Sequence, residues 1–309
     1  MLWRRLLHMG APVVDLTYRI DRLPEPGGES LASEAAVTPG GGFNMMAAAR
    51  AAGLSVACGG RVGSGPNGEM LLAALAAAGI PLIAPRARWA DSGSCVVLVT
   101  PDGERSFVSH PGAEGRIESP DLADLRPAAG DVVFVSGYTL AYPGAAPALA
   151  GWVAALSAAV PLAFDPGPLV GRIAPDRLSA VLARIEWLGC SAAEATAMTG
   201  AAVPEEAAEA LRARGCRNIA VRDGARGCLI VPRGGPARRV PGFRVPVVDT
   251  NGAGDTHFGA FLAELGRGAS PEAAARYANA AAALSVMRQG GAAAPADADI
   301  RAFASSGAG

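Results

Sequence analysis

The most informative feature of this sequence is a residue that it lacks. The chain of 309 residues contains no lysine, so all 27 of its basic side chains are arginine. A phosphate loop of the G-x-x-x-x-G-K-[ST] type, the lysine of protein kinases, a pyridoxal Schiff base and a Ser-x-x-Lys dyad all require lysine. The sequence therefore excludes these kinds of site.

Charged residues are also scarce, and their signs nearly balance. They make up 18% of the chain, with 28 acidic residues against 27 basic ones, while 50% of the residues are hydrophobic. This composition argues against disorder, and against the strong positive field that draws a protein to nucleic acids or anionic membranes. We therefore expect no nucleic-acid partner.

Cysteines and long apolar runs are the other scarce features. The cysteines form no C-x-x-C pair, which argues against a disulfide framework or a zinc site and favours buried, reduced thiols. The longest apolar stretch, LLAALAAAGIPLIAP, is interrupted by Gly79 and Pro81, and the first residues lack the apolar run of a signal peptide. We expect a cytoplasmic protein that does not bind membranes. The cysteines are Cys58, Cys95, Cys190, Cys216 and Cys228.

What the sequence does contain is an alternation of strand-like and helix-like segments. Short, continuous apolar runs such as DVVFVSG, PLAFDPG and NIAVRDG alternate with alanine-rich runs such as NMMAAARAAG and EEAAEALRARG. We assign PVVDL and IPLIAP to the same series of strands. Continuous apolar strands joined by helices are typical of a parallel sheet that is covered on both faces. The pattern predicts an α/β core.

Residues 18–38 and 93–109 interrupt this alternation, because neither segment has a helical period. The second segment, GSCVVLVTPDGERSFVS, places Asp102-Gly103 between two extended runs, which indicates a hairpin. We expect the two segments to form a small β lid inserted into the core. On this interpretation residues 1–309 form a single domain, although length alone does not decide the number of domains.

Two glycine-rich turns compete for a functional role. The first, Gly63 to Gly68, spells G-x-G-x-x-G before a helical run, and Asp91 lies downstream at a spacing that suits a dinucleotide-binding site. However, the turn does not follow the opening strand of the chain, and Pro66 stiffens it. A strand-to-helix turn built from small residues is the interpretation that we favour over NAD or FAD binding.

The second turn, Asn251 to Asp255, is better placed for chemistry. Its small side chains leave the backbone N–H groups at the start of a helix free to bind an anion, where the helix dipole adds positive charge. The turn could thus hold a phosphate without lysine, and Asp255 could accept the proton of a hydroxyl that attacks this phosphate. The alternative is that Asp255 only caps the helix, and the spacing alone does not separate the two.

Together, DTNGAGDTHFGAFL and PGGGFNMMAAARAAG resemble the ribokinase-like, or PfkB, carbohydrate kinase family. The resemblance extends from Gly10 to about Pro295. It implies an ATP-dependent phosphotransferase with a three-layer αβα core of mainly parallel strands, a β lid over the sugar, and often a homodimer formed through the lid.

The signature block also implies roles for single residues. Asp255 corresponds to the catalytic base, and Gly252, Ala253 and Gly254 correspond to the anion hole. Asp249 is the acid that opens the signature, near the place where some members of the family bind a potassium ion. The resemblance therefore favours the catalytic interpretation of Asp255 over the cap.

On the substrate side, Asp15 corresponds to a family acid that binds sugar hydroxyls. Gly41, Gly42 and Asn44 fall in the family's glycine-rich substrate segment, and Glu114 is expected to reach the substrate where the lid returns to the core. These residue types suit a polyol, because a carboxylate accepts hydroxyl protons and an amide both donates and accepts. A helix cap is the alternative role of Asn44.

On the nucleotide side, the resemblance implies a turn under the ATP phosphates and a helix wall beside the adenine. The small side chains of this helix could equally reflect packing, and we assign His257 to the protein interior rather than to the reaction. The residues concerned are Arg222, Gly224 and Gly227 in the turn, and Asn279 and Ala283 on the helix.

The sequence also departs from the family pattern. Pro39 replaces the first glycine of the motif G-G-x-x-x-N, and Gly65 replaces an acid. Ser191 replaces the asparagine of the N-x-x-E segment, which helps to place magnesium, while Glu194 of that segment is retained. A hydroxyl cannot span the distance of an amide, so we expect weaker metal binding than is usual for the family.

These observations lead to one principal hypothesis and two alternatives. The principal hypothesis is a Mg²⁺-ATP-dependent kinase that phosphorylates a primary hydroxyl of a sugar or sugar-like polyol. The first alternative is a nucleoside kinase of the same family, because a nucleoside offers the same ribose hydroxyls. The second is a non-catalytic regulator that binds a sugar or a nucleotide on the same fold.

Overall fold

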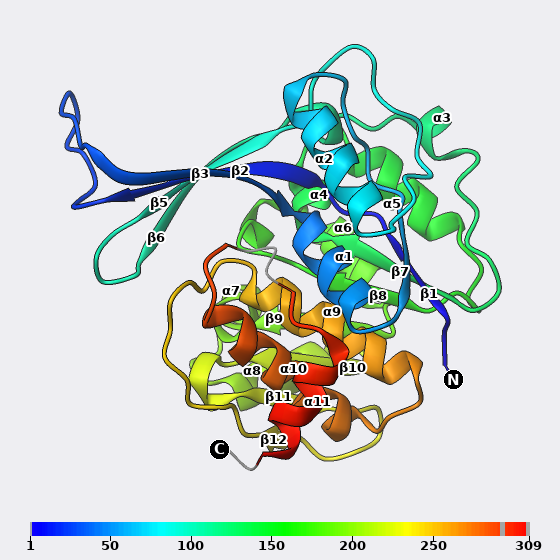
Figure 1. Ribbon diagram of the computed structural model, residues 1–309. Helices are drawn as coiled ribbons and strands as arrows, with labels where there is room; N and C mark the ends of the chain where they lie inside the picture. The colour runs from blue at the N-terminus through cyan, green and yellow to red at the C-terminus, as the bar shows by residue number, and fades with distance from the viewer. Residues whose placement is uncertain (1, 291–293, 307–309) are drawn as a thin grey trace.

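The core of the protein is an eight-stranded sheet. The computed structural model describes residues 2–290 and 294–306, which Figure 1 shows as a ribbon. Across the described sheet the order is β12-β11-β10-β9-β8-β7-β1-β4, and only β11 runs antiparallel to its neighbours. The strands are β1 (Arg5–His8), β4 (Ser55–Cys58), β7 (Asp131–Ser136), β8 (Leu162–Asp165), β9 (Trp187–Ser191), β10 (Asn218–Arg222), β11 (Cys228–Val231) and β12 (Arg238–Val240).

Helices cover both faces of this sheet. The side chains of each strand point alternately to one face and to the other, so the buried strands need an apolar covering on both. Along β7, Val132 and Phe134 join one apolar core, and Val133 and Val135 join the other. The predicted three-layer αβα arrangement is confirmed. The first core contains α1 (Gly42–Ala51), α2 (Pro66–Ala77), α9 (Ala253–Gly266), α10 (Pro271–Val286) and α11 (Asp297–Ser305). The second contains α3 (Ser119–Leu122), α4 (Gly137–Ala141), α5 (Ala146–Ala155), α6 (Pro175–Leu182), α7 (Ala192–Thr199) and α8 (Pro204–Ala213).

Two predicted core strands were wrong. PVVDL belongs to the lid, and the core strand of this region is RLLH at Arg5–His8. The longer segment PVVDLTYRI alternates apolar with polar residues, which suits a sheet with one face toward solvent or a cavity. IPLIAP forms only an isolated bridge between Cys58 and Leu82. Pro81 has no N–H to donate to a ladder, which explains why the segment does not continue as a strand.

The lid is a second sheet, of four strands, with the order β3-β2-β5-β6. Figure 1 shows it projecting from one side of the core. The expected hairpin at Asp102-Gly103 joins β5 to β6, and Gly103 adopts a φ of 83° in its turn. The lid strands begin well before residue 18, so they include residues that were predicted to bind the substrate. They are β2 (Pro12–Ile20), β3 (Ala32–Gly41), β5 (Ser94–Val99) and β6 (Arg105–His110).

The register of the lid strands gives the sheet two different faces. Asp15 is paired with Cys95, and Cys95 with Ser109, so these side chains share the face that is turned toward the core. On the opposite face, Tyr18 and Val108 are 38% and 63% exposed. The inward face thus brings Asp15 and Ser109 to the cavity, and Val97 and Val99 form a small apolar cluster further along the same face, whereas the outward face is mainly apolar.

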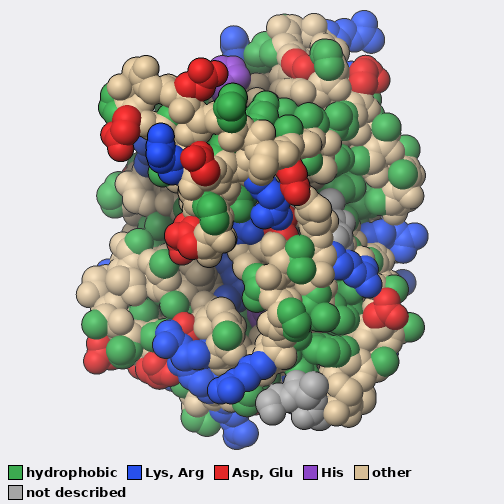
Figure 2. Space-filling view, turned by 60° about the vertical axis from the view of Figure 1, so that its left-hand side comes forward, with side chains coloured by type: hydrophobic (Ala, Val, Ile, Leu, Met, Phe, Trp, Pro, Cys, Tyr) green, Lys and Arg blue, Asp and Glu red, His purple; other side chains and the backbone are tan. Residues whose placement is uncertain are grey.

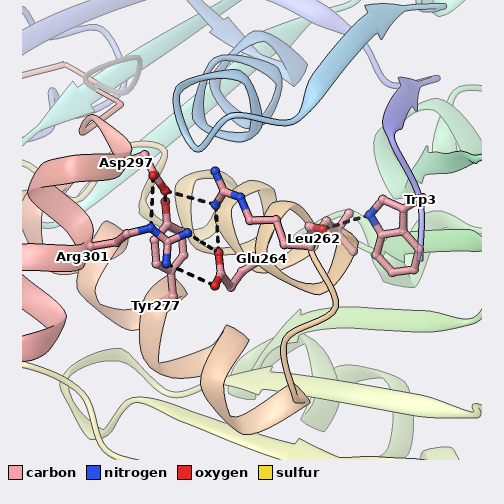
Figure 3. A network of polar contacts seen from close by, with 7 residues as sticks. Trp3, Leu262, Glu264, Tyr277, Asp297 and Arg301 are labelled. Atoms are coloured by element: carbon pink, nitrogen blue, oxygen red, sulfur yellow. Dashed lines mark hydrogen bonds and ion pairs between the residues drawn. The ribbon is translucent and has the colours of Figure 1, made fainter. Parts of the chain in front are cut away.

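Contacts near both ends of the chain fasten α9 and α10 (Figure 3). The indole Nε1 of Trp3 donates to the Leu262 carbonyl at 2.9 Å, and the Tyr277 hydroxyl donates to Asp297 at 2.6 Å. Arg301 of α11 pairs with Asp297 and, at 2.8 Å, with Glu264 of α9. These contacts hold the helices whose ends line the site described below. No helix among the described residues is both long and apolar enough to span a bilayer.

Helix α9 lies against α1 at one glycine. A Cβ atom on Gly259 would approach the Met45 carbonyl oxygen to 2.6 Å and the Ala49 nitrogen to 3.0 Å. Since both contacts are backbone atoms, they cannot move without shifting α1. Gly259 thus sets the spacing between the helix that carries Asp255 and the helix that carries Asn44.

We expect Gly259→Ala to destabilise the protein by about 1–3 kcal/mol, because the methyl group must push two helices apart. Thermal unfolding measures this as a lower melting temperature. Gly151→Ala is the matched control, because its Cβ would meet nothing within 4 Å in the middle of α5. That substitution should stabilise the helix by roughly 0.5–1 kcal/mol. Equal melting temperatures for the two variants would contradict the assigned helix contact.

Candidate active site

The first cavity lies under the lid, at the carboxyl ends of β1, β7 and β8. It has a volume of about 280 Å³. The carboxyl ends of parallel strands are where open α/β sheets bind ligands. Its walls include three carboxylates, Asp15 from the lid, Asp165 from the end of β8 and Asp255 from α9. The cavity is thus acidic and is lined by both the core and the lid.

A second cavity, of about 590 Å³, opens on the other side of the first turn of α9. It lies between the 3-10 helix Gly224–Arg226, the loop of residues 242–247 and α10. Figure 2 shows acidic and basic side chains gathered around a hollow near the middle of one face of the molecule. The residues predicted for the nucleotide side all line the second cavity: Arg222, Gly224, Gly227, Asn279 and Ala283.

The turn of residues 250–255 separates the two cavities. Asn251 and Asp255 line the first cavity, whereas Thr250, Ala253 and Gly254 line the second. A group that occupies the second cavity and binds at the start of α9 therefore lies beside the Asp255 carboxylate, which faces the first cavity. This arrangement suits the transfer of a group between two bound molecules.

The start of α9 has the features of an anion-binding site. Gly252 is the N-cap of α9, with a φ of 69°, and no described side chain caps the start of the helix. The N–H groups of the first helical turn have no partners within the helix, and they carry the positive end of its dipole. Asp255 lies inside the helix and lines the first cavity. The alternative role of Asp255 as a cap was therefore wrong.

Burial and the neighbouring carboxylates perturb the acids of the first cavity. Burial, together with the charge of Asp165, raises the pKa of Asp255 to about 7, although Arg222 and Asn44 oppose the shift. Burial also raises the pKa of Asp15 to about 6, against a hydrogen bond from Asn251. A carboxyl with a pKa near neutrality is suited to take up a proton and release it again.

Arg222 supplies the positive charge between the cavities. Its Nη2 atom lies 2.9 Å from Asp165 and 3.6 Å from Glu194. Its Nη1 atom is buried without a hydrogen-bond partner among the described residues. A Cβ on Gly254 would lie 3.4 Å from Arg222 Nε, so the guanidinium lies close to the anion-binding turn. Burial also raises the pKa of Asp165, to about 6, despite the charge of Arg222.

Sequence reasoning did not identify Asp165, Asn251 or Arg105 as site residues. Asp165 could have been found as the polar residue that ends an apolar strand, in PLAFDPG. Asn251 lies within the signature, and its side-chain amide donates to Asp15 at 3.1 Å. No sequence signal connects Arg105 with the turn, because it pairs with Asp249 across 144 residues.

The predicted substrate residues are only partly brought together. Asp15, Gly41, Gly42 and Asn44 line the first cavity. Gly41 has a φ of 55° and is itself the N-cap of α1, so Asn44 is not the cap of this helix. The Asn44 Oδ1 atom is buried without a hydrogen-bond partner among the described residues, which leaves an acceptor for a bound hydroxyl.

Glu114 does not line the first cavity, and the expectation that it reaches the substrate is corrected. Its carboxylate accepts from the N–H of Gly93 at 3.0 Å and from the N–H of Gly112 at 2.9 Å. These residues lead into β5 and out of β6, so Glu114 fastens the base of the lid. Burial raises the pKa of Glu114, and the two N–H bonds oppose the shift.

His257 is buried as expected, but it also lines the second cavity. Its Nε2 atom lies 3.1 Å from Asn279 Oδ1, and Asn279 Nδ2 donates to the carbonyls of Val240 and Pro241. Since the amide group donates to both carbonyls, its oxygen accepts from His257 Nε2. Burial lowers the pKa of His257 to about 3, so the ring is neutral and has a structural role at this wall.

The two predicted metal residues lie apart, each with its own partners. Glu194 pairs with Arg222, and its Oε2 atom accepts from the Ser191 N–H at 2.7 Å. Asp249 pairs with Arg105 of the lid. Within residues 2–290 and 294–306, no group of three or more His, Cys, Asp or Glu side chains could hold a metal ion by itself. A metal bound here would therefore need further ligands besides these side chains.

The competing turn at Gly63 to Gly68 has no free anion site. Asp91 Oδ2 accepts from the Asn67 N–H at 3.0 Å, and Asp91 Oδ1 accepts from the Gly68 N–H at 2.8 Å. The acid that resembled a ribose-binding residue therefore occupies the N-terminus of α2. Pro66 opens this helix, where its missing N–H costs nothing. The interpretation as a structural strand-to-helix turn agrees with these contacts.

Comparison with known proteins identifies the family. The sequence profile described as pfkB family carbohydrate kinase matches residues 6–298, which is nearly the whole chain. The chain belongs to the PfkB family of carbohydrate kinases. It is 34% identical to the ATP-dependent ribose-1-phosphate kinase of Halopiger xanaduensis, over 97% of this chain and 98% of that protein. It is 32% identical to the uncharacterized sugar kinase YegV of Escherichia coli, over 93% of this chain and 90% of that protein.

Solved structures share the fold. The adenosine kinase of Sinorhizobium meliloti superposes with a TM-score of 0.82 at 22% identity, covering 99% of this chain and 100% of that chain. The ribokinase-like fold class predicted from the sequence is confirmed. As a PfkB kinase the protein is a phosphotransferase with an alcohol acceptor, and it acts as an ATP-dependent sugar or nucleoside kinase.

The raised pKa values of the cavity acids predict how stability depends on pH. The folded-state pKa values of Asp255, Asp15 and Asp165 all lie above the ordinary value of 3.8. Folding thus favours their protonated forms, and this stabilisation is lost as the pH rises through about 6 to 7. The melting temperature should be higher near pH 5 than near pH 8. Asp255→Asn should reduce the difference, and an unchanged difference would contradict the assigned burial.

Proposed function

We propose that this PfkB kinase transfers the γ-phosphate of ATP to a primary hydroxyl of a neutral sugar or sugar-like polyol. ATP occupies the second cavity, with its terminal phosphate at the turn of residues 252–254. The acceptor occupies the first cavity, with its hydroxyl at Asp255. The observation that carries this proposal is the position of the turn, which lines both cavities with adjacent residues.

The transfer needs one proton acceptor and several positive groups. The hydroxyl oxygen forms a bond to the γ-phosphorus while the bond to the bridging oxygen of ADP breaks, and the hydroxyl proton passes to the Asp255 carboxylate. The N–H groups of Ala253 and Gly254 and the free Nη1 of Arg222 stabilise the charge on the transferred phosphoryl group. Arg222 thereby supplies a fixed charge in a chain without lysine.

We propose that Mg²⁺ binds as the companion of ATP. Mg²⁺ needs only one or two carboxylates when phosphates and water complete its octahedron. Glu194 is suited to hold it, because its Oε1 atom makes no hydrogen bond to any residue that the structure describes, while Oε2 is fixed by Ser191. When bound, the ion would neutralise part of the triphosphate charge. The potassium ion expected near Asp249 fits less well, because both oxygens of this carboxylate already have partners.

The charge of the first cavity favours a neutral acceptor. Among the described residues, its walls contain Asp15, Asp165 and Asp255 but no arginine. A sugar phosphate would bring a charge of about −1.5 to −2 near these acids, without a guanidinium to pair with it. The Halopiger relative is named for ribose-1-phosphate. We therefore propose that this chain differs from that relative in its acceptor.

A nucleoside acceptor remains the second candidate. Phe107, Phe134, Tyr138 and Tyr142 line the first cavity, and aromatic rings of this kind can stack on a base. The non-catalytic alternative is not retained, because the family assignment and the intact arrangement around Asp255 both indicate a kinase. A cytoplasmic location remains a prediction, consistent with five free, buried cysteines and with the need for ATP.

The outer face of the lid is suited to a homodimer. Leu16, Tyr18, Val96 and Val108 share this face by register, and Val37 of β3 adds to it with 54% exposure. An apolar sheet face that is open to water favours contact with a second copy of the same surface. We propose that two lids pack together through this face.

Asp255→Asn tests the proposed catalytic base directly. The change keeps the shape of the turn but removes the proton acceptor, so kcat should fall about 10²–10⁴-fold while ATP still binds. A coupled assay of ADP release measures the rate. In the wild type, kcat/KM should rise with pH through the pKa of Asp255, which is about 7.

Asp91→Asn is the matched control, because it makes the same change in a carboxylate that only caps α2. Asparagine keeps only one of the two acceptor oxygens, so this variant should lose some stability. Its rate should stay near that of the wild type, because Asp91 is not among the residues that line either cavity. Near-normal turnover in Asp255→Asn would remove the proposed mechanism. Loss of ATP binding in Asp255→Asn would instead mean that the turn had been distorted.

The charge of the cavity predicts acceptor preference. In a screen of ADP release, neutral pentoses, hexoses or nucleosides should be phosphorylated with a kcat/KM at least about tenfold above that of their phosphate esters, a ratio that corresponds to about 1.4 kcal/mol. Each sugar is compared with its own 1-phosphate, which keeps the ring constant. Preference for the phosphate ester would overturn the neutral-acceptor proposal and leave the kinase assignment intact.

A further inference from the structure

The lid reaches the catalytic turn through one arginine. Arg105 is the first residue of β6, and its guanidinium contacts both Asp249 Oδ1 and Thr250 Oγ1. The pair is largely withdrawn from solvent, with side-chain exposures of 12% for Arg105 and 10% for Asp249. Arg105 therefore contacts the segment that immediately precedes the anion-binding residues.

Asp249 contacts residues from three parts of the chain. Besides the contact with Arg105, its Oδ1 atom accepts from the Asn251 N–H at 2.9 Å, and its Oδ2 atom accepts from the Gly290 N–H at 3.0 Å. The carboxylate thus fixes the turn to the segment that follows α10. Its charge is balanced by a side chain that belongs to the lid.

A second lid strand contacts the same turn. The Asn251 Nδ2 atom donates to Asp15 Oδ2 at 3.1 Å, and Asp15 lies on β2. The turn is therefore held from β6 through Asp249 and Thr250, and from β2 through Asn251. Both contacts involve residues next to Gly252, where α9 begins.

A buried carboxylate needs a nearby cation, and the removal of its partner leaves an uncompensated charge. In some members of the family a potassium ion is expected near the corresponding acid. In this chain Asp249 already has three partners, the Arg105 guanidinium and the N–H groups of Asn251 and Gly290. We propose that Arg105 is the resident cation of the turn and takes the place of a monovalent metal ion. When the lid closes, Arg105 then reaches Asp249 and Thr250 and orders the anion-binding turn at the same time. This inference rests on the proposed function for its effect on rate, and Arg105 acts as a positioning residue.

The test compares K⁺ with tetramethylammonium in three proteins: the wild type, Arg105→Ala and Arg19→Ala. Arg19 is the matched control, because it pairs with Glu34 on the same lid in an exposed bridge. Total salt is kept at about 0.1 M so that screening is constant. The wild type and Arg19→Ala should have the same kcat and the same KM for ATP in both salts. Arg105→Ala should lose at least about tenfold in kcat/KM without K⁺ and recover when K⁺ is added.

Melting temperature provides a readout that needs no turnover. K⁺ should raise the melting temperature of Arg105→Ala above its value in tetramethylammonium, and it should leave the other two proteins unchanged. The inference is overturned if the wild type itself depends on K⁺. It is also overturned if Arg105→Ala equals the wild type in both salts, or if this variant loses activity without any response to K⁺.

Arg105→Lys keeps the test decisive if the alanine variant does not fold. Lysine retains the charge, so this variant should work without K⁺ and show no K⁺-dependent melting, and a requirement for K⁺ would count against the inference. A protein that shows the melting response but phosphorylates no acceptor would contradict the proposed function alone. Normal phosphorylation without the response would contradict only the role of Arg105.

Discussion

On the proposed function, the first turn of α9 holds a highly charged anion on one side while carboxylates lie on the other, and the roles of the surrounding residues follow from this constraint. Arg222 supplies part of the positive charge that this arrangement needs, because it lies 2.9 Å from Asp165 and against Gly254. The helix dipole and the N–H groups of the first turn add further positive charge. Because the chain contains no lysine, a buried arginine and backbone N–H groups have to supply the positive charge that a lysine ammonium group supplies in other phosphate-binding sites.

The lid belongs to this electrostatic arrangement as well as covering the cavity. It contributes Asp15 to the wall of the first cavity and Arg105 to the turn. Glu114 ties the two ends of its hairpin to each other through backbone N–H groups. The outward face is mainly apolar, so the same four strands carry residues of the first cavity on one face and a proposed subunit contact on the other. Movement of the lid would therefore change the charge around the catalytic turn as well as its access to water.

Local patterns predicted the layers of the fold, whereas the residues predicted for the two cavities came largely from the family resemblance and are a minority of the residues that line them. Apolar runs reveal a covered parallel sheet, and glycines before a helix reveal an anion site. The sequence did not predict the contacts that depend on how distant segments meet. Asp165 matters only because β8 and β10 end on either side of β9, which brings Asp165 to Arg222, and Arg105 only because the lid folds over residue 249. PVVDL was misplaced for a related reason, since its partners β3 and β5 cannot be read from the segment alone.

On the proposed function, a phosphoryl group passes between the two cavities at the turn of residues 250–255. The most direct measurement is a crystal structure with a non-hydrolysable ATP analogue and a neutral sugar bound together. We predict the terminal phosphate at the N–H groups of Ala253 and Gly254 and at Arg222, and a primary hydroxyl about 2.6–3.2 Å from the Asp255 carboxylate. A nucleotide in the first cavity, or a sugar whose hydroxyls all point away from Asp255, would contradict the account.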